Sequence, residues 1–374
     1  MNQRLHGGLR FALDIGHGAW EKAQRNGDLP AAVARTLTIG QLADDAGIDS
    51  LWASEDPDGW DALAVLGALA SRTTRVRLGT GVVNPYYRHP SLIAASVTTL
   101  DALSGGRAFL GLGRGQTEWY RQSLGMTIGK PSLALEETFQ LLRQWWTQPY
   151  RAEAAEGATV FPVAGWQRGI GPLQSRPPIY LAAVGPKALS LAGRYADGVL
   201  FNDLSSRTFM ADAVARVRAE AADAGRNPAS LAFFARAAVT VTDDPEAVYE
   251  RRKATIALIH TLPGMERLLT TPGFDIEQII AEVRRVMRTE ETLARGGGFP
   301  DLRSAGDIAA ARDLIPTDLM AELVIAGPAD RVRTRLAEFA ALGITDVFLA
   351  SPGPDANAAD IAATIAAIRP GFAP

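Results

Sequence analysis

The chain has 374 residues, of which 47% are hydrophobic and 21% are charged, and its formal net charge is −3. It therefore lacks the basic excess of proteins that bind polyanions, and we expect no nucleic-acid partner. The absence of cysteine excludes disulfides, thiolate zinc sites and cysteine nucleophiles. No signal-peptide pattern and no long apolar run is present, so we expect a cytoplasmic protein without membrane contact.

Short, continuous apolar runs recur along the chain, and segments with helical spacing, such as 39–46, follow them. Continuous runs are typical of parallel strands that are covered on both faces. The sequence predicts strands at 11–15, 50–54, 76–83, 108–113, 179–184, 198–202, 233–241 and 346–350. Eight strand–helix units in one chain of this length favour a single (β/α)8 TIM-barrel domain over 1–374, with a doubly wound sheet as the alternative.

Two connections are too long for plain barrel loops. The segment 149–178, after the fourth strand, has an irregular or hairpin-like pattern, whereas 243–345, after the seventh strand, is largely helical. A long connection with its own periodicity is compatible with a barrel. We expect both insertions to cover the mouth at the carboxyl ends of the strands, where barrel enzymes place their sites.

Three glycine-containing stretches follow predicted strands. In "GTGVVNPYYRHP" (79–90) the glycines either form turns or let a flat ligand approach the backbone. Gly111, Gly113 and Gly115 alternate at the end of the fourth strand, where free backbone amides can hold a phosphate or let a ring pass closely, although structural turn glycines give the same spacing. "GPK" at 185–187 opens a helix directly after a strand, which suits an anion, although a simple turn with a solvated lysine gives the same pattern.

Taken together, the stretches 75–90, 99–116 and 177–202 resemble the luciferase-like flavin and deazaflavin oxidoreductases. Within these, the chain is most similar to the subgroup that includes methylenetetrahydromethanopterin reductase and uses the deazaflavin coenzyme F420. The resemblance covers 11–242 and the last helix–strand unit. The long helical segment before residue 320 contributes least to it.

The resemblance implies where a cofactor binds. In that family the third strand ends in a bulge with a non-prolyl cis peptide bond that backs the flavin ring, and Gly81-Val82, followed by Asn84, stands at the matching place. The family holds the cofactor phosphate and side chain with the loop after strand four and the helix start after strand five. The matching residues here are Gly113, Arg114, Gly115, Gln116, Ala183, Gly185, Pro186 and Lys187.

The candidate catalytic residues are Glu55, Asp56 and His17. Glu55 matches an acidic residue that often lines the ring in the family, whereas Asp56 stands where the family often has histidine. Either the two carboxylates handle a proton, with Glu55 the better candidate, or catalysis relies on binding and hydride geometry. The alternative is a capping Asp and a solvated Glu. His17 follows the first strand and either reaches the site from the barrel mouth or is incidental.

The resemblance implies an enzyme that transfers a hydride between coenzyme F420 and a small organic substrate. An FMN-dependent monooxygenase is the nearest alternative, and a flavin- or deazaflavin-binding protein without turnover is a third. Gln116 stands where a deazaflavin-dependent sugar-phosphate dehydrogenase subgroup has a glutamate, which disfavours that activity. The four histidines lack metal-ligand spacing, so we expect no metal. The family also suggests a homodimer.

Overall fold

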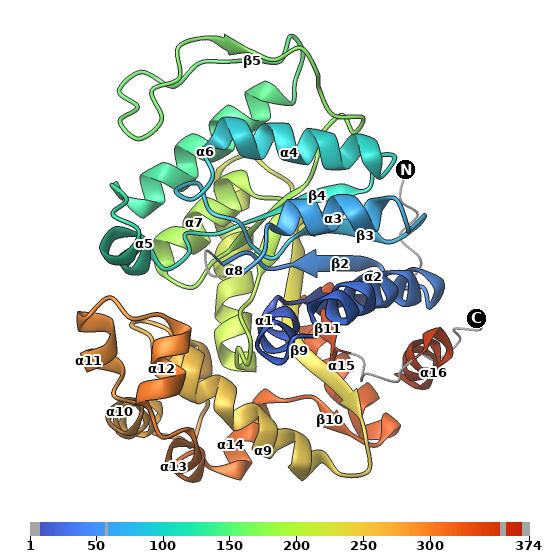
Figure 1. Ribbon diagram of the computed structural model, residues 1–374, viewed down its shortest axis with the longest axis vertical. Helices are drawn as coiled ribbons and strands as arrows, with labels where there is room; N and C mark the ends of the chain where they lie inside the picture. Colours follow the sequence, from blue (N-terminus) through green and yellow to red (C-terminus); the bar gives the residue numbers. More distant parts are fainter. Residues whose placement is uncertain (1–7, 57–58, 352–356, 369–374) are drawn as a thin grey trace.

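The computed structural model describes residues 8–56, 59–351 and 357–368. Its centre is a closed barrel of eight parallel strands (Figure 1). These strands are β1 (Arg10–Ile15), β2 (Ser50–Ala53), β3 (Arg77–Thr80), β4 (Ala108–Leu112), β7 (Ile179–Ala182), β8 (Gly198–Leu200), β9 (Ala232–Val241) and β11 (Asp346–Leu349). Their order is β9-β11-β1-β2-β3-β4-β7-β8, and β8 pairs with β9 to close the barrel. The predicted TIM barrel is therefore confirmed, and the doubly wound alternative is wrong.

Helices surround this barrel. They are α1 (Gly18–Asn26), α2 (Leu29–Asp45), α3 (Ala62–Ala70), α4 (Pro90–Leu103), α5 (Thr117–Ser123), α6 (Pro131–Trp145), α7 (Pro186–Tyr195), α8 (Arg207–Asp223), α15 (Ala329–Ala341) and α16 (Ala358–Ile368). Proline occupies the first position of α4, α6 and α7, where its fixed φ suits a helix start and its missing N–H costs nothing. Asp61 caps α3 by accepting hydrogen bonds from the backbone N–H groups of Leu63 and Ala64.

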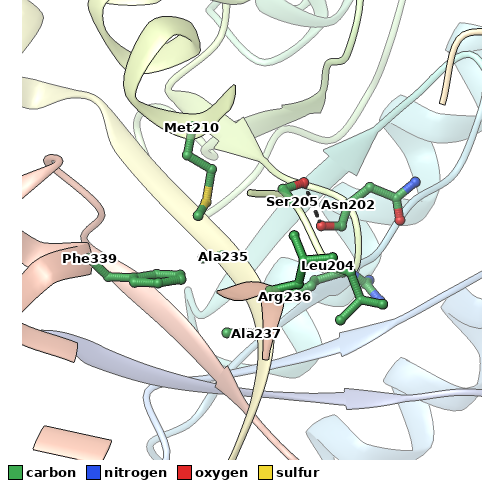
Figure 2. A pocket seen from close by; sticks show the side chains of 9 residues that line it. Asn202, Leu204, Ser205, Met210, Ala235, Arg236, Ala237 and Phe339 are labelled. Atoms are coloured by element: carbon green, nitrogen blue, oxygen red, sulfur yellow. Dashed lines mark hydrogen bonds between the residues drawn. The ribbon is translucent and has the colours of Figure 1, made fainter. Parts of the chain in front are cut away.

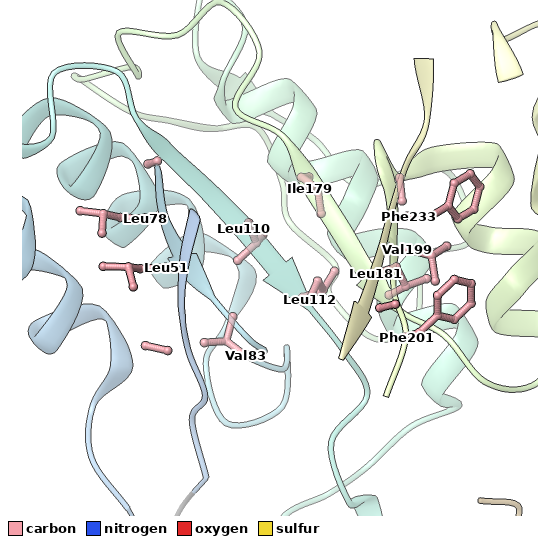
Figure 3. Packing of buried hydrophobic residues seen from close by; sticks show 14 of the residues in the cluster. Leu51, Leu78, Val83, Leu110, Leu112, Ile179, Leu181, Val199, Phe201 and Phe233 are labelled. Atoms are coloured by element: carbon pink, nitrogen blue, oxygen red, sulfur yellow. The ribbon is translucent and has the colours of Figure 1, made fainter. Parts of the chain in front are cut away.

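Each barrel strand is buried on both faces, which explains its continuous apolar sequence. On the outer face, residues such as Leu51, Leu110 and Phe233 pack towards the helices (Figure 3). On the inner face, Trp52 lies at the centre, with the ring centroids of Phe109 and Phe234 at 4.4 and 4.8 Å from its own. The barrel interior is therefore a packed aromatic core below the mouth rather than a channel.

The segment 149–178 begins after α6 and contains a short antiparallel pair, β5 (Arg151–Ala152) and β6 (Trp166–Gln167). It packs on α6, where the indole N–H of Trp145 donates a hydrogen bond to the carbonyl of Trp166. This segment thus connects a helix to the next strand, because α5 and α6 intervene between it and the end of β4.

The segment 243–345 is mostly helical, as expected. It contains α9 (Pro245–Thr255), a π-helical turn at Ile256–His260, α10 (Ile276–Met287), α11 (Thr289–Ala294), α12 (Phe299–Ala305), α13 (Ile308–Asp313) and α14 (Thr317–Leu323). The short strand β10 (Ala326–Gly327) then pairs with the end of β9. Side chains of α9, α10, α13 and α14 form a hydrophobic cluster of their own beside the barrel. None of the helices in the described part of the chain combines the length and apolar character needed to cross a membrane.

Candidate functional site

A pocket of about 1050 Å³ opens at the carboxyl ends of the barrel strands. The loops after β2, β3, β4, β7 and β8 line it, together with Arg236 of β9. The segment 243–345 contributes Ile259, Leu262–Met265, Arg267 and Phe299 to its wall, whereas none of its lining residues comes from 149–178. Only one of the two insertions therefore borders this pocket. A small hollow next to it, between β9 and α8, shares Asn202 and Arg236 (Figure 2).

The bulge after β3 forms part of the pocket wall. The Gly81–Val82 peptide bond is cis, as expected. Val83 then returns to the sheet, where it forms a bridge with Leu112 of β4. A Cβ atom on Gly111 would lie 1.9 Å from the carbonyl oxygen of Thr80, so only glycine lets β3 approach β4 this closely. The glycine in β4 is thus explained by packing against the bulge.

All eleven residues predicted to bind a cofactor line this one pocket. They are Gly81, Val82, Asn84, Gly113, Arg114, Gly115, Gln116, Ala183, Gly185, Pro186 and Lys187. Two of the three glycine amides predicted to be free at the end of β4 are hydrogen-bonded within the protein. The N–H of Gly111 donates to Thr80 Oγ1, and the N–H of Gly113 donates to the carbonyl of Val83. These two amides hold the bulge, so they cannot also hold a phosphate.

One end of the pocket is cationic. Arg114, Lys130 and Lys187 line it, and α6 and α7 begin there with their first residues, Pro131 and Pro186, also in the wall. The N-terminus of a helix carries partial positive charge and unpaired N–H groups, both of which favour an anion. This end of the pocket therefore suits a ligand with several negative charges.

The glycine at position 185 indicates whether a ligand group fits at this end of the pocket. Its backbone, with φ −82° and ψ 161°, is accessible to any residue, so the conformation does not require glycine. A Cβ atom placed on Gly185 would meet no heavy atom within 4 Å, so packing does not require glycine either. A side chain here would enter the pocket beside the start of α7. The open space beside Gly185 and the first turn of α7 is compatible with a phosphate group, and the residues fit the phosphate-bearing cofactor that the family implies.

Glu55 is buried, with 1% of its side chain exposed, and it is fully engaged by protein donors. The Arg88 guanidinium donates to both carboxylate oxygens at 2.7 Å, and the N–H of Ala62 donates to Oε2. Arg88 also pairs with Asp61. The hydrogen bonds that Arg88 donates to Glu55 and Asp61 raise the pKa of Arg88 despite its burial. This geometry makes Glu55 an anchor for Arg88 and for the start of α3, which differs from the expected role as proton carrier.

His17 lies beside the pocket, joined to it through Asp56, which lines the wall. The imidazole Nε2 is 3.1 Å from Asp56 Oδ2, and Nδ1 is 2.5 Å from Glu21 Oε1. The hydrogen bond with Asp56 raises the pKa of His17, with a further contribution from Glu21, while partial burial opposes the shift. The structure thus brings His17 and Asp56 together as a pair that favours a protonated imidazole at the edge of the pocket.

The sequence analysis missed several residues of the wall. Arg236 is the most important of them, because with its partner Asp14, which lies outside the wall, it places charge at the mouth of an apolar barrel. The available signal was a charged residue inside an apolar strand run, "FFARAAV" for Arg236 and "FALDI" for Asp14. Asn202 and Asp203 after β8 and the apolar residues at 259–265 carried no such signal, since nothing in the sequence places them near the bulge.

Comparison with known proteins supports this picture. The family model described as "Luciferase-like monooxygenase" matches residues 11–346. The chain is 30% identical over 317 residues, 84% of this chain and 89% of the relative, to 5,10-methylenetetrahydromethanopterin reductase of Archaeoglobus fulgidus. It is 32% identical over 230 residues, 57% of this chain and 61% of the relative, to the F420-dependent hydroxymycolic acid dehydrogenase of Mycobacterium tuberculosis.

Among solved structures, the coenzyme F420-dependent tetrahydromethanopterin reductase of Methanopyrus kandleri has the same fold. It aligns with a TM-score of 0.72 and 24% identity, over 96% of this chain and 97% of that one. The family match covers the barrel from β1 to the start of β11, including the bulge and the cationic end of the pocket. The chain is therefore an enzyme of the luciferase-like monooxygenase family, as the resemblance in its sequence implied.

Proposed function

We propose that this enzyme transfers a hydride between coenzyme F420 and a small organic substrate. The observation that carries this proposal is a single pocket that combines the bulge at Gly81-Val82 with a cationic end beside Gly185. A flat ring and an anionic tail belong to the same cofactor, and here their two predicted subsites share one cavity. The name of the similar F420-dependent hydroxymycolic acid dehydrogenase supports the same cofactor.

The charge of the pocket favours coenzyme F420 over FMN. FMN presents a single phosphate, whereas coenzyme F420 carries a phosphodiester and further carboxylates on its side chain. Arg114, Lys130 and Lys187 at the cationic end, with Arg267 in the wall above, exceed what one phosphate needs. These four cations are exposed. A polyanionic ligand can pair with more of them than a single phosphate can.

When bound, the deazaflavin ring supplies hydride chemistry, and the protein supplies binding, orientation and a proton. We propose His17 as the group that supplies the proton, because Asp56 and Glu21 favour its protonated form and Asp56 connects it to the pocket. Glu55 holds Arg88 and the loop after β2 in place. Ile259, Leu262–Met265 and Phe299 wall the side of the pocket facing the insertion.

Binding measurements with purified protein test the proposal. The quenching of ligand fluorescence on binding to the protein gives the Kd. We expect the Kd of coenzyme F420 to be at least about tenfold lower than that of FMN, since each additional charge contact is worth about 1–3 kcal/mol. Tight FMN binding without affinity for coenzyme F420 would contradict the proposal and favour a monooxygenase. Binding of reduced coenzyme F420 without its oxidation by any of a panel of ketones, imines and activated alkenes would indicate a cofactor-binding protein without turnover.

We also propose that the enzyme is a homodimer. Supporting this, a row of exposed apolar residues runs over α4 and the adjoining segment: Leu92, Leu103, Trp166, Ile170 and Leu173 are 49–68% exposed. The two elements lie side by side, because Arg168 donates a hydrogen bond to the Ser91 carbonyl. An apolar row of this kind is typical of an interface. Sedimentation analysis should give twice the chain mass, and Ile170→Asp combined with Leu173→Asp should give the mass of one chain; a monomeric wild type would contradict the proposal.

A further inference from the structure

Arg236 and Asp14 are charged residues on strands whose other inward side chains are apolar. Side chains alternate along a strand, so Asp14 shares the inner face of β1 with Ala12, and Arg236 shares the inner face of β9 with Phe234. Both charges therefore lie one step above the aromatic core, at the mouth of the barrel. The register between β9 and β11 shifts between Val347 and Leu349, which adds residues to β9 at this level.

The Arg236 guanidinium makes two kinds of contact. It forms a two-nitrogen ion pair with Asp14, with Nη1–Oδ2 and Nη2–Oδ1 distances of 3.1 Å. Nη2 also donates to the carbonyl oxygen of Gly81 at 2.8 Å, and only 13% of the side chain is exposed. The guanidinium carbon lies 5.1 Å from the centre of the Phe348 ring. Arg236 thus links β9 and β1 to the bulge after β3.

The contact with Gly81 completes the support of the bulge. The N–H of Gly81 donates to the carbonyl of Ala53 on β2, as a strand residue would. Its carbonyl, however, accepts from Arg236 across the barrel instead of from the neighbouring strand. The plane of the peptide group between Gly81 and Val82 is consequently fixed by a side chain, and that peptide group forms the pocket wall.

We propose that Arg236 is a positioning residue, oriented by Asp14, which fixes the Gly81 carbonyl and thereby the surface on which the cofactor ring lies. This inference rests on the proposed function. Asp14 and Arg236 form a close ion pair at this site. Burial raises the pKa of Asp14, while burial lowers that of Arg236 and the carboxylate of Asp14 more than offsets it. The positive charge on Arg236 is therefore retained, which strengthens its hydrogen bond to the carbonyl.

A second ion pair provides a matched control. Arg10 of β1 donates to both carboxylate oxygens of Asp346 on β11, at 2.8 and 2.6 Å, at the opposite end of the same barrel. Both pairs join strands of the barrel through an arginine and an aspartate, but only the pair at the mouth contacts the bulge. If the Arg236–Asp14 pair only stabilised the barrel, removing either pair would change the Kd for the cofactor by the same factor.

The test compares two double variants, Asp14→Leu/Arg236→Met and Arg10→Met/Asp346→Leu, with the wild type. Replacing both partners avoids leaving one buried charge unpaired. The thermal midpoint shows that each variant is folded, and equilibrium titration with coenzyme F420 gives Kd. We expect the first variant to raise Kd at least about tenfold, as loss of a charged hydrogen bond does, and the second to leave it within about twofold. Arg236→Lys, which keeps the charge and one donor, should give an intermediate Kd and a shifted absorption band of the bound ring.

An equal Kd in the wild type and the Asp14→Leu/Arg236→Met variant would overturn the inference while the proposed function stands, and so would an equal rise in both double variants. If the wild type binds FMN and not coenzyme F420, the proposed function fails, and the same comparison is made with FMN. A rise in the FMN Kd confined to the Asp14→Leu/Arg236→Met variant then supports the positioning role. A wild type that binds neither ring would overturn both proposals.

Discussion

The two ends of the barrel use charged residues in different surroundings. At the amino end, Arg77 donates to the Tyr180 hydroxyl, its guanidinium carbon lies 5.2 Å from the centre of the Phe109 ring, and Arg10 pairs with Asp346. Each of these charges therefore closes the end of a packed core. At the carboxyl end, Arg236 and Asp14 also form a two-nitrogen ion pair, but here Arg236 borders a pocket of about 1050 Å³. A paired charge thus indicates a site only where it adjoins space that the protein does not fill.

Gly185→Leu should have the largest effect on cofactor binding, because the leucine side chain fills space at the carboxyl end of the barrel. The backbone accepts leucine and no heavy atom lies within 4 Å of its Cβ, so we expect no loss of stability. Coenzyme F420 should lose at least about a hundredfold in affinity, since the side chain occupies the open space beside the first turn of α7 and cannot be accommodated by a packed wall. Titration and thermal unfolding measure the two effects. A variant that binds as tightly as the wild type would place the phosphate elsewhere.

Asp44→Ala, at the amino end of the barrel, should lower stability and leave cofactor binding unchanged. The Asp44 carboxylate accepts hydrogen bonds from the backbone N–H groups of Thr74, Arg75 and Val76, which hold the turn before β3. Leaving these donors unpaired should cost about 3 kcal/mol of the free energy of unfolding. Denaturant unfolding measures this cost, and the Kd for coenzyme F420 should stay within about twofold. Weaker cofactor binding without a loss of stability would contradict the division between the two ends.

The same carboxylate predicts a pH dependence. Burial raises the pKa of Asp44, but the hydrogen bonds outweigh it and hold the pKa below the usual value of 3.8. A depressed pKa means that the stabilisation is complete above about pH 4, the unfolded-state value, and is lost as the pH falls through the folded-state value. The Asp44→Ala variant should therefore show a smaller decline in stability than the wild type in this acidic window. Parallel declines would show that other carboxylates control acid unfolding.

His17 should make the smallest contribution to the pH dependence of stability. Its contribution is lost as the pH rises, whereas that of Asp44 is lost as the pH falls. Its pKa is raised, mainly by the hydrogen bond to Asp56, so its stabilisation is complete below about pH 6.5 and is lost as the pH rises through the folded-state pKa. Asp56→Asn should lower the pKa of His17 and reduce this loss, which we expect to be at most about 1 kcal/mol. NMR titration of the imidazole, assigned with His17→Asn, measures the change. An unchanged pKa in Asp56→Asn would remove Asp56 as its partner.

The barrel was predictable because parallel buried strands read as continuous apolar runs, and the structure confirms all eight. The third strand was predicted over 76–83 but ends at Thr80, since the bulge interrupts its hydrogen bonding before Val83 returns. The internal packing of 243–345 was not predictable in detail, because its short helices form a core with one another through contacts that periodicity alone does not reveal.

The glycine-containing motifs indicated which loops line the pocket, whereas the partners of its side chains were not predictable. Glu55 could be placed at the end of β2, but its partner Arg88 comes from the loop after β3. Asp14 and Arg236 are 222 residues apart, so no local pattern connects them. A single sequence shows which strand ends carry charge, but only the closed barrel shows which charges meet.

A crystal structure of the enzyme with coenzyme F420 tests the central claim most directly. The account predicts the ring against Gly81-Val82, within contact of the Arg236 side of the bulge, and the phosphate beside Gly185 and Lys187. A ring bound away from the bulge, or a phosphate outside the cationic end of the pocket, would contradict it.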